Sequence, residues 1–268
     1  MKRKFINVKS LLATAILVSC SVLIGCQKET IDEPEVKTDA SVSHLKTTGG
    51  SCPSSLTCPT GHYNNGGQLT QQCGCYVQAG LGTYKQAFYN ANAGDDFLAA
   101  AMMETNTMNP YSYVYGDKYP NDVYSWYYTD NGGKPSNMNG PKVWKAGAPK
   151  QFDASNFGAC KQNWFMMRQS YSRYSGKTAL DWNSGWELNA NKNIDIASYK
   201  AGRAKWSESQ FLAGHRNGPT GLSEALQGRY TYDIQNFIAA YQWTRSQIQK
   251  SSSYRINDVR FWVSVPNI

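Results

Sequence analysis

The 268-residue sequence lacks the motifs on which several large classes of enzyme depend. It contains only three histidines, and it has no HExxH-type metal motif and no Gly-rich phosphate loop. It also has no internal repeat of the kind that builds solenoids and propellers. We therefore expect a single non-repetitive domain that uses neither a metal ion nor another cofactor.

The first 25 residues have the pattern of a secretory signal. A basic start, MKRK, is followed by an apolar run that is too short for a membrane span. The run ends in LIGC at residues 23–26, which resembles the bacterial lipobox, so Cys26 is predicted to carry a lipid and to become the mature N-terminus. Cys20 fits the same pattern less well, and the alternative is an ordinary signal peptide with an incidental cysteine. The prediction is an extracytoplasmic lipoprotein, anchored at the outer membrane or cell surface.

The segment after the lipid anchor is polar and ends in two glycines. Residues 26–50 are predicted to form a disordered tether, which leaves residues 51–268 as one domain with a sizeable core. The formal net charge of +8 falls to +4 when the four basic residues of the signal are removed. A nucleic-acid partner therefore loses its main support, and we expect a monomer that contacts the membrane only through its lipid.

Five cysteines remain in the mature chain after Cys26. Four of them lie close together, at Cys52, Cys58, Cys73 and Cys75. The last two flank one glycine and are poorly placed to bond each other, so each is expected to pair with one of the first two. Two disulfides would then staple a cap over residues 51–76, and a four-cysteine zinc site is the alternative. The fifth, Cys160, is interpreted as a buried thiol and not as a nucleophile.

Helical patterns dominate the domain. The sequence predicts helices over 94–105, 155–172, 195–213 and 231–250, and a last strand over 258–265. Between the first two helices, residues 109–152 are rich in Tyr, Gly, Pro and Asn, as expected of short strands and turns. The predicted fold class is α+β, mainly helical, with a small β-sheet and loop insertion that forms one wall of a substrate cleft.

Glu104 is the only acid in the apolar stretch FLAAAMMETNTM, residues 97–108. Burial at such a place disfavours the charged form of a carboxyl group and keeps it able to give a proton. Glycosidases need an acid of this kind together with a second, ionised carboxylate across the scissile bond. The next acid along the chain is Asp117, in the tyrosine-rich YSYVYGDKY. A purely structural role for a glutamate at a helix end is the alternative.

Four local sequences carry a resemblance to a known family. AMMETNTM, YGDK, DASNFGACKQNW and MMRQ are similar to segments of the lysozyme-like endo-β-1,4-mannanases of glycoside hydrolase family 134, mostly within residues 97–170. The resemblance implies a lysozyme-like fold and a β-mannan substrate. It also implies an inverting hydrolysis, with Glu104 as general acid and Asp117 as general base.

One departure from the family pattern leaves competitors for the base. The GDxK and DxxNFG segments lie close together in the family but are separated here by residues 119–152. Asp153 is the strongest competitor and a candidate for substrate binding, although an Asp ahead of a helix is commonly an N-cap. Asp122 and Asp130 lie in sequences that turn formation explains.

Candidate substrate contacts come from aromatic and amide side chains. Tyrosines and tryptophans crowd the region around Asp117, and Trp126 is favoured among them as a face that stacks on a sugar ring. The resemblance places Gln162 and Asn163 in the cleft, where they would bind substrate or position the water; a solvated helix face is the alternative.

Other polar and apolar residues near these segments are given structural roles. Trp164, Met166 and Met167 are predicted to lie in the core. His215 and Arg216 are predicted to cap the end of the preceding helix and not to be catalytic.

Two other functions remain open. The same scaffold could cut peptidoglycan or chitosan, since any glycoside can be hydrolysed by two carboxylates. A lipoprotein that binds glycans without cleaving them is the non-enzymatic alternative.

Overall fold

The fold is α+β, and the part of the chain that the structure describes contains helices and three pairs of short antiparallel strands. The computed structural model describes residues 49–105, 107–110, 156–177 and 182–265. The described strands are β1 (Thr60–His62), β2 (Gln68–Thr70), β3 (Cys73–Val77), β4 (Asn156–Phe157), β5 (Gln162–Asn163) and β6 (Val259–Val263). β1 pairs with β2, β3 with β6, and β4 with β5.

Helices form most of the described chain. They are α1 (Leu81–Asn90), α2 (Gly94–Glu104), α4 (Trp164–Ser170), α5 (Trp182–Ala190), α6 (Lys192–Lys205), α7 (Glu208–Leu226) and α8 (Tyr232–Gln249). Two 3-10 helices, η5 (Ser172–Tyr174) and η6 (Ser252–Arg255), join them. Within the described ranges, no helix has the length and apolar character needed to cross a membrane.

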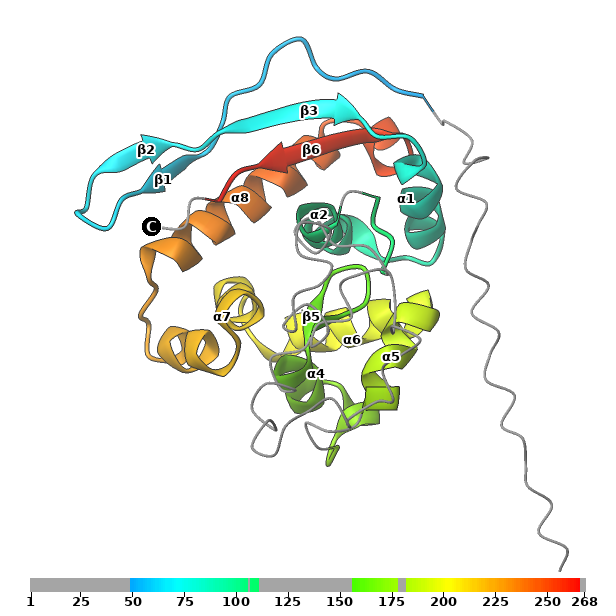
Figure 1. Ribbon diagram of the computed structural model, residues 1–268, viewed down its shortest axis with the longest axis vertical. Helices are drawn as coiled ribbons and strands as arrows, with labels where there is room; N and C mark the ends of the chain where they lie inside the picture. The colour runs from blue at the N-terminus through cyan, green and yellow to red at the C-terminus, as the bar shows by residue number, and fades with distance from the viewer. Residues whose placement is uncertain (1–48, 106, 111–155, 178–181, 266–268) are drawn as a thin grey trace, which may run out of the picture. The chain divides into compact units, whose positions relative to one another are not determined.

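The core forms where α2 meets α8. The middle of α2 is entirely apolar and buried, from Phe97 to Met102. Along α8, Ile234, Phe237, Tyr241 and Ile248 are buried at helical spacing and form one face of the helix. Figure 1 shows both α2 and α7 beside α8. The apolar pattern that predicted these two helices therefore marks the surfaces that they bury.

The N-terminal cap is attached to the last strand of the chain. β3 and β6 lie side by side, with Cys73 opposite Val263 and Val77 opposite Val259 (Figure 1). Two disulfides, Cys52–Cys75 and Cys58–Cys73, tie the preceding loop to β3. The expected pairing of each later cysteine with an earlier one is confirmed, and all four sulfurs are engaged in it. Because such bridges persist in oxidising compartments, they indicate an extracytoplasmic location.

Several predicted elements are confirmed. The helices expected over 94–105 and 231–250 are α2 and α8, and the last strand is β6. Trp164, Met166 and Met167 are buried in α4, as predicted. The strands and turns predicted over 109–152 fall almost wholly outside the described residues.

Two helix predictions are wrong in their extent. The helix expected over 155–172 begins only at Trp164, because the residues before it form the β4–β5 hairpin, in which Gly158 and Lys161 have positive φ angles. The helix expected over 195–213 is two helices. α6 ends at Lys205 and α7 begins after Ser207, whose hydroxyl accepts from the backbone N–H of Gln210 while the Gln210 side chain accepts from the N–H of Ser207.

Candidate active site

Glu104 is the last residue of α2. The helix ends there because Thr105 is extended, and its N–H and hydroxyl both donate to the carbonyl of Ala101. The side chain of Glu104 is 17% exposed, so its carboxylate lies at the edge of the core and still reaches the surface.

His215 is the direct partner of this carboxylate. Its Nε2 lies 3.1 Å from Glu104 Oε1, and the His215 side chain is only 6% exposed. The imidazole is held between two phenyl rings, with ring centroids 6.3 Å from Phe211 and 5.9 Å from Phe237 and both pairs stacked within 24°. The two phenyl rings fix the plane of the imidazole, so its Nε2 stays directed at the Glu104 carboxylate.

His215 and Arg216 end the first segment of α7, directly before its kink, and both side chains reach other elements. His215 bonds Glu104, and the Arg216 guanidinium forms a two-point ion pair with Asp233 of α8. Helix periodicity along one segment cannot show that a histidine meets a carboxylate 111 residues earlier in the chain. The only available signal was that His215 is one of three histidines in the sequence.

A kink in α7 places a second predicted residue next to this helix. Asn217 and Gly218 leave helical geometry, and Gly218 adopts φ 58°, which favours glycine. A Cβ added to Gly218 would lie 3.7 Å from Nδ2 of Asn163. Within four residues, α7 therefore contacts Glu104 through His215 and approaches Asn163 at the kink.

Asn163 and Gln162 do not lie on a solvated helix face. They form β5 and are 5% and 3% exposed. The Asn163 side chain caps α4 by accepting from the backbone N–H of Phe165, at 3.1 Å. The Gln162 amide donates to the carboxylate and the backbone carbonyl of Asp195, at 2.5 and 2.8 Å. Gln162 is thereby tied to α6.

Asp195 of α6 is a buried acid whose hydrogen bonds hold the β4–β5 hairpin in place. It is 1% exposed and also accepts from the backbone N–H of Ala159, at 2.7 Å. Burial raises the pKa of the Asp195 carboxyl to about 7, against the opposing effects of these hydrogen bonds and of the Lys161 charge. The sequence analysis missed Asp195, because an acid in the first turn of a helix normally faces solvent.

Cys160 at the tip of the hairpin is buried, as predicted, and forms no disulfide. Its thiol lies 3.4 Å from the carbonyl of Phe97 in α2. Burial, and then the negative charges of Asp195 and Glu104, raise the pKa of the Cys160 thiol well above its ordinary value. A thiol held neutral in this way is a poor nucleophile.

Four predicted residues lie outside the described part of the chain. These are Asp117, Trp126, Asp153 and Cys26. Over the described ranges, no group of three or more His, Cys, Asp or Glu side chains is arranged to hold a metal ion.

The geometry has a defined chemical capacity. A carboxyl group at the edge of the core, hydrogen-bonded to a fixed imidazole and reachable from solvent, can exchange a proton with a bound substrate. The Gln162 amide of the β4–β5 hairpin is bonded to Asp195, so α6 fixes the hairpin.

Comparison with known proteins adds one family. Residues 136–265 match the family model described as glycosyl hydrolase family 134. The matched range contains the hairpin and His215, and it begins after Glu104 and Asp117. No curated protein sequence matches the chain.

Proposed function

Since residues 136–265 match glycosyl hydrolase family 134, we propose that the chain is an endo-acting hydrolase of β-1,4-mannan. The coarser statement, that it is a glycoside hydrolase with a polysaccharide substrate, follows from the family. The mannan specificity is supported by the local sequences around Glu104, Asp117 and Asn163. The proposed scaffold is lysozyme-like, which agrees with the α+β class of the described residues.

The observation that carries the proposed mechanism is the Glu104–His215 pair. Glu104 lies outside the matched range and His215 lies inside it, so the fold joins the candidate acid to the family domain. In the proposed reaction Glu104 protonates the glycosidic oxygen as the bond to the leaving sugar breaks. His215 acts on it as a positioning residue that fixes the carboxyl orientation.

The second half of the proposed reaction is activation of water by Asp117. An inverting enzyme needs the base on the opposite face of the sugar, where it takes a proton from the water that attacks the anomeric carbon. Trp126 and Asp153 are proposed to contact substrate, and Asn163 to bind a sugar hydroxyl or the water. Gln162 contributes through the hairpin that it ties to Asp195.

Location completes the proposal. The disulfides indicate an extracytoplasmic protein. We further propose that lipidation of Cys26 anchors it to the outer membrane or cell surface as a monomer, so that cleavage takes place where polymeric mannan is accessible. Metabolic labelling with a palmitate analogue, with Cys26→Ser as the control, tests the anchor.

The experiment that tests the reaction is proton NMR of the anomeric signals during digestion of mannohexaose by residues 48–268. Inversion predicts that α-anomers appear first. Glu104→Gln and Asp117→Asn should each lower kcat by about 10²-fold or more, because each removes one proton-transfer step. Glu224→Gln, which changes an acid of α7 away from this site, should retain full activity.

The possible outcomes separate the alternatives. If β-anomers appear first, the mechanism is retaining and Asp117 is not a base. If Asp153→Asn is inactive while Asp117→Asn is active, the base is Asp153. Clearing of cell-wall suspensions without mannan cleavage would show a peptidoglycan hydrolase, and release of reducing ends from chitosan alone would show a chitosanase. Affinity for mannan without new reducing ends would show a binding protein.

A further inference from the structure

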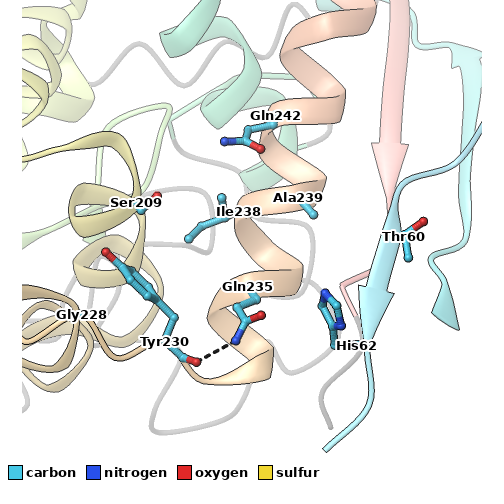
Figure 2. A pocket seen from close by; sticks show the side chains of 9 residues that line it. All are labelled: Thr60, His62, Ser209, Gly228, Tyr230, Gln235, Ile238, Ala239 and Gln242. Carbon is cyan, nitrogen blue, oxygen red and sulfur yellow. Dashed lines mark hydrogen bonds between the residues drawn. The ribbon is translucent and has the colours of Figure 1, made fainter. Parts of the chain in front are cut away.

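A pocket lies on a different face of α8 from the one that packs on His215. Its volume is about 560 Å³. The residues that line it are Thr60, His62, Ser209, Gly228, Tyr230, Gln235, Ile238, Ala239 and Gln242. Figure 2 shows four of them along α8, with Tyr230 and Ser209 on one side and Thr60 and His62 on the other.

The pocket face of α8 has the spacing of a single helical stripe. Gln235, Ile238, Ala239 and Gln242 recur at intervals of three and four residues, so their side chains leave the helix in one direction. Phe237, which packs on His215, belongs to the other, buried stripe. α8 therefore separates the pocket from the candidate active site.

The β1 side of the pocket is held to α8 by hydrogen bonds. The side chain of Asn236 accepts from the backbone N–H of His62 at 2.8 Å and donates to its carbonyl at 3.0 Å. Gln71, next to β2, donates to the Asn236 carbonyl at 3.0 Å. A Cβ added to Gly61 would lie 2.7 Å from Asn236 Oδ1, so β1 docks closely enough to need glycine. These contacts fix β1 and hold the His62 ring at the pocket.

The other side of the pocket is also fixed. The Gln235 amide donates to the carbonyl of Tyr230 at 2.9 Å, and this bond ties the turn between α7 and α8 to the start of α8 (Figure 2). The Tyr230 ring packs against a small buried cluster that includes Ala213 and Ile234. The pocket is thus built from fixed elements on both sides.

The chemistry of the lining points to an uncharged ligand. None of the described residues that line the pocket is Asp, Glu, Lys or Arg. Glu208 accepts from Gln242 but is itself paired with Arg203 and Arg245, so its charge is compensated. Hydroxyl, amide and imidazole groups offer several hydrogen bonds, while Tyr230 and Ile238 offer apolar surface. This combination suits a sugar, whose ring has hydroxyl groups at its edge and C–H groups on its faces.

We propose that this pocket is a second carbohydrate-binding site, which holds an uncharged β-1,4-linked oligosaccharide away from the catalytic centre. The identity of the glycan rests on the proposed function, because the pocket itself selects only for an uncharged, hydroxyl-rich chain. A ligand hydroxyl would donate to the amide oxygens of Gln235 and Gln242, and a pyranose face would lie on Tyr230. Binding here would keep a long polysaccharide on the enzyme between cleavage events.

The test measures mannohexaose binding to the Glu104→Gln chain by calorimetry, with and without a blocked pocket. Ala239→Trp fills the pocket from a helix position and removes no hydrogen bond. Ser223→Trp places the same side chain at an exposed position of α7 that does not line the pocket, and is the matched control. We expect two binding events in Glu104→Gln and in its Ser223→Trp form, and one event when Ala239→Trp is added.

Activity gives an independent measurement. In the chain with Glu104 intact, Ala239→Trp should lower kcat/KM on insoluble mannan about three- to tenfold and leave it unchanged on mannohexaose. Equal numbers of binding events with and without Ala239→Trp would overturn the proposal, as would equal loss on both substrates. If the native enzyme does not cleave mannan, the proposed function fails. The pocket is then still judged by whether Ala239→Trp removes a binding event.

Discussion

Asp195 offers a prediction whose sign and size both follow from the structure. Burial raises the pKa of its carboxyl from an ordinary value of 3.8 to about 7. The unfolded chain releases this proton near pH 4, whereas the folded chain holds it until about pH 7. Between those values the folded state binds more protons, so this group makes the protein less stable as the pH rises.

The magnitude comes from the two pKa values. One pKa unit corresponds to about 1.4 kcal/mol, so titration of Asp195 lowers the free energy of unfolding by about 2.5 kcal/mol between pH 5 and pH 8. Asp195→Asn keeps the shape of the protonated acid and an oxygen for the backbone N–H of Ala159. The Gln162 amide keeps its bond to the backbone carbonyl of residue 195 and loses only the one to the side chain. The variant should therefore fold and lose this part of the pH dependence.

The assay is urea denaturation, followed by tryptophan fluorescence, at pH 5 and pH 8. The loss of stability between the two pH values should be about 2.5 kcal/mol greater in the native protein than in Asp195→Asn. Lys85, whose pKa is lowered to about 7 by burial, titrates equally in both proteins and cancels in the difference. Asp95→Asn is the control. In the native protein the hydrogen bond from Arg255 lowers the pKa of the Asp95 carboxyl, so this group does not titrate between pH 5 and pH 8 and its replacement should leave the pH dependence of stability unchanged. An Asp195→Asn protein with the native pH dependence would refute the reasoning.

Three further predictions rest on single contacts. His215→Phe keeps the ring stack but loses the bond to Glu104, so kcat should fall about tenfold with KM unchanged and the pH–rate profile displaced; a native profile would contradict a positioning role. Removing the Cys58–Cys73 bridge by a double change to serine should lower the free energy of unfolding by about 3 kcal/mol in urea denaturation, as expected for a loop of 15 residues; no loss would show that the bridge does not constrain the unfolded chain. Gly61→Ala brings a methyl group against the Asn236 side chain and should lower the free energy of unfolding by about 1–3 kcal/mol in the same measurement; an unchanged stability would show that β1 can shift to admit the methyl group.

The elements that the sequence predicted best are those buried on one face along their length. α8 and α2 have long apolar patterns, and a buried helical face must carry such a pattern whatever it packs against. The hairpin before α4 was mistaken for helix because each of its strands is only two residues long, which is too short to show the alternation that marks a strand. The break between α6 and α7 had a local signal, the capping box of Ser207 and Gln210, which the apolar periodicity obscured.

The candidate site was predicted unevenly for a similar reason. Glu104 stands out locally, because a lone acid in an apolar helix needs an explanation. His215 does not stand out, since its importance lies in a contact across 111 residues. Asp195 appeared to be an ordinary first-turn acid, and only its burial beneath Ala159 and Gln162 reveals its role.

The sequence by itself determined the family resemblance, the candidate acid and the cysteines available for the cap, because each is a property of a short stretch of chain. The tertiary structure decided which imidazole bonds Glu104, how the buried Asp195 carboxyl holds the hairpin, and where the neutral pocket beside β1 and α8 lies. Each of these depends on side chains that are distant in sequence and become neighbours only when the core packs. The pocket illustrates this most clearly: its α8 stripe is visible in the sequence, but its opposite wall comes from β1, more than 170 residues earlier.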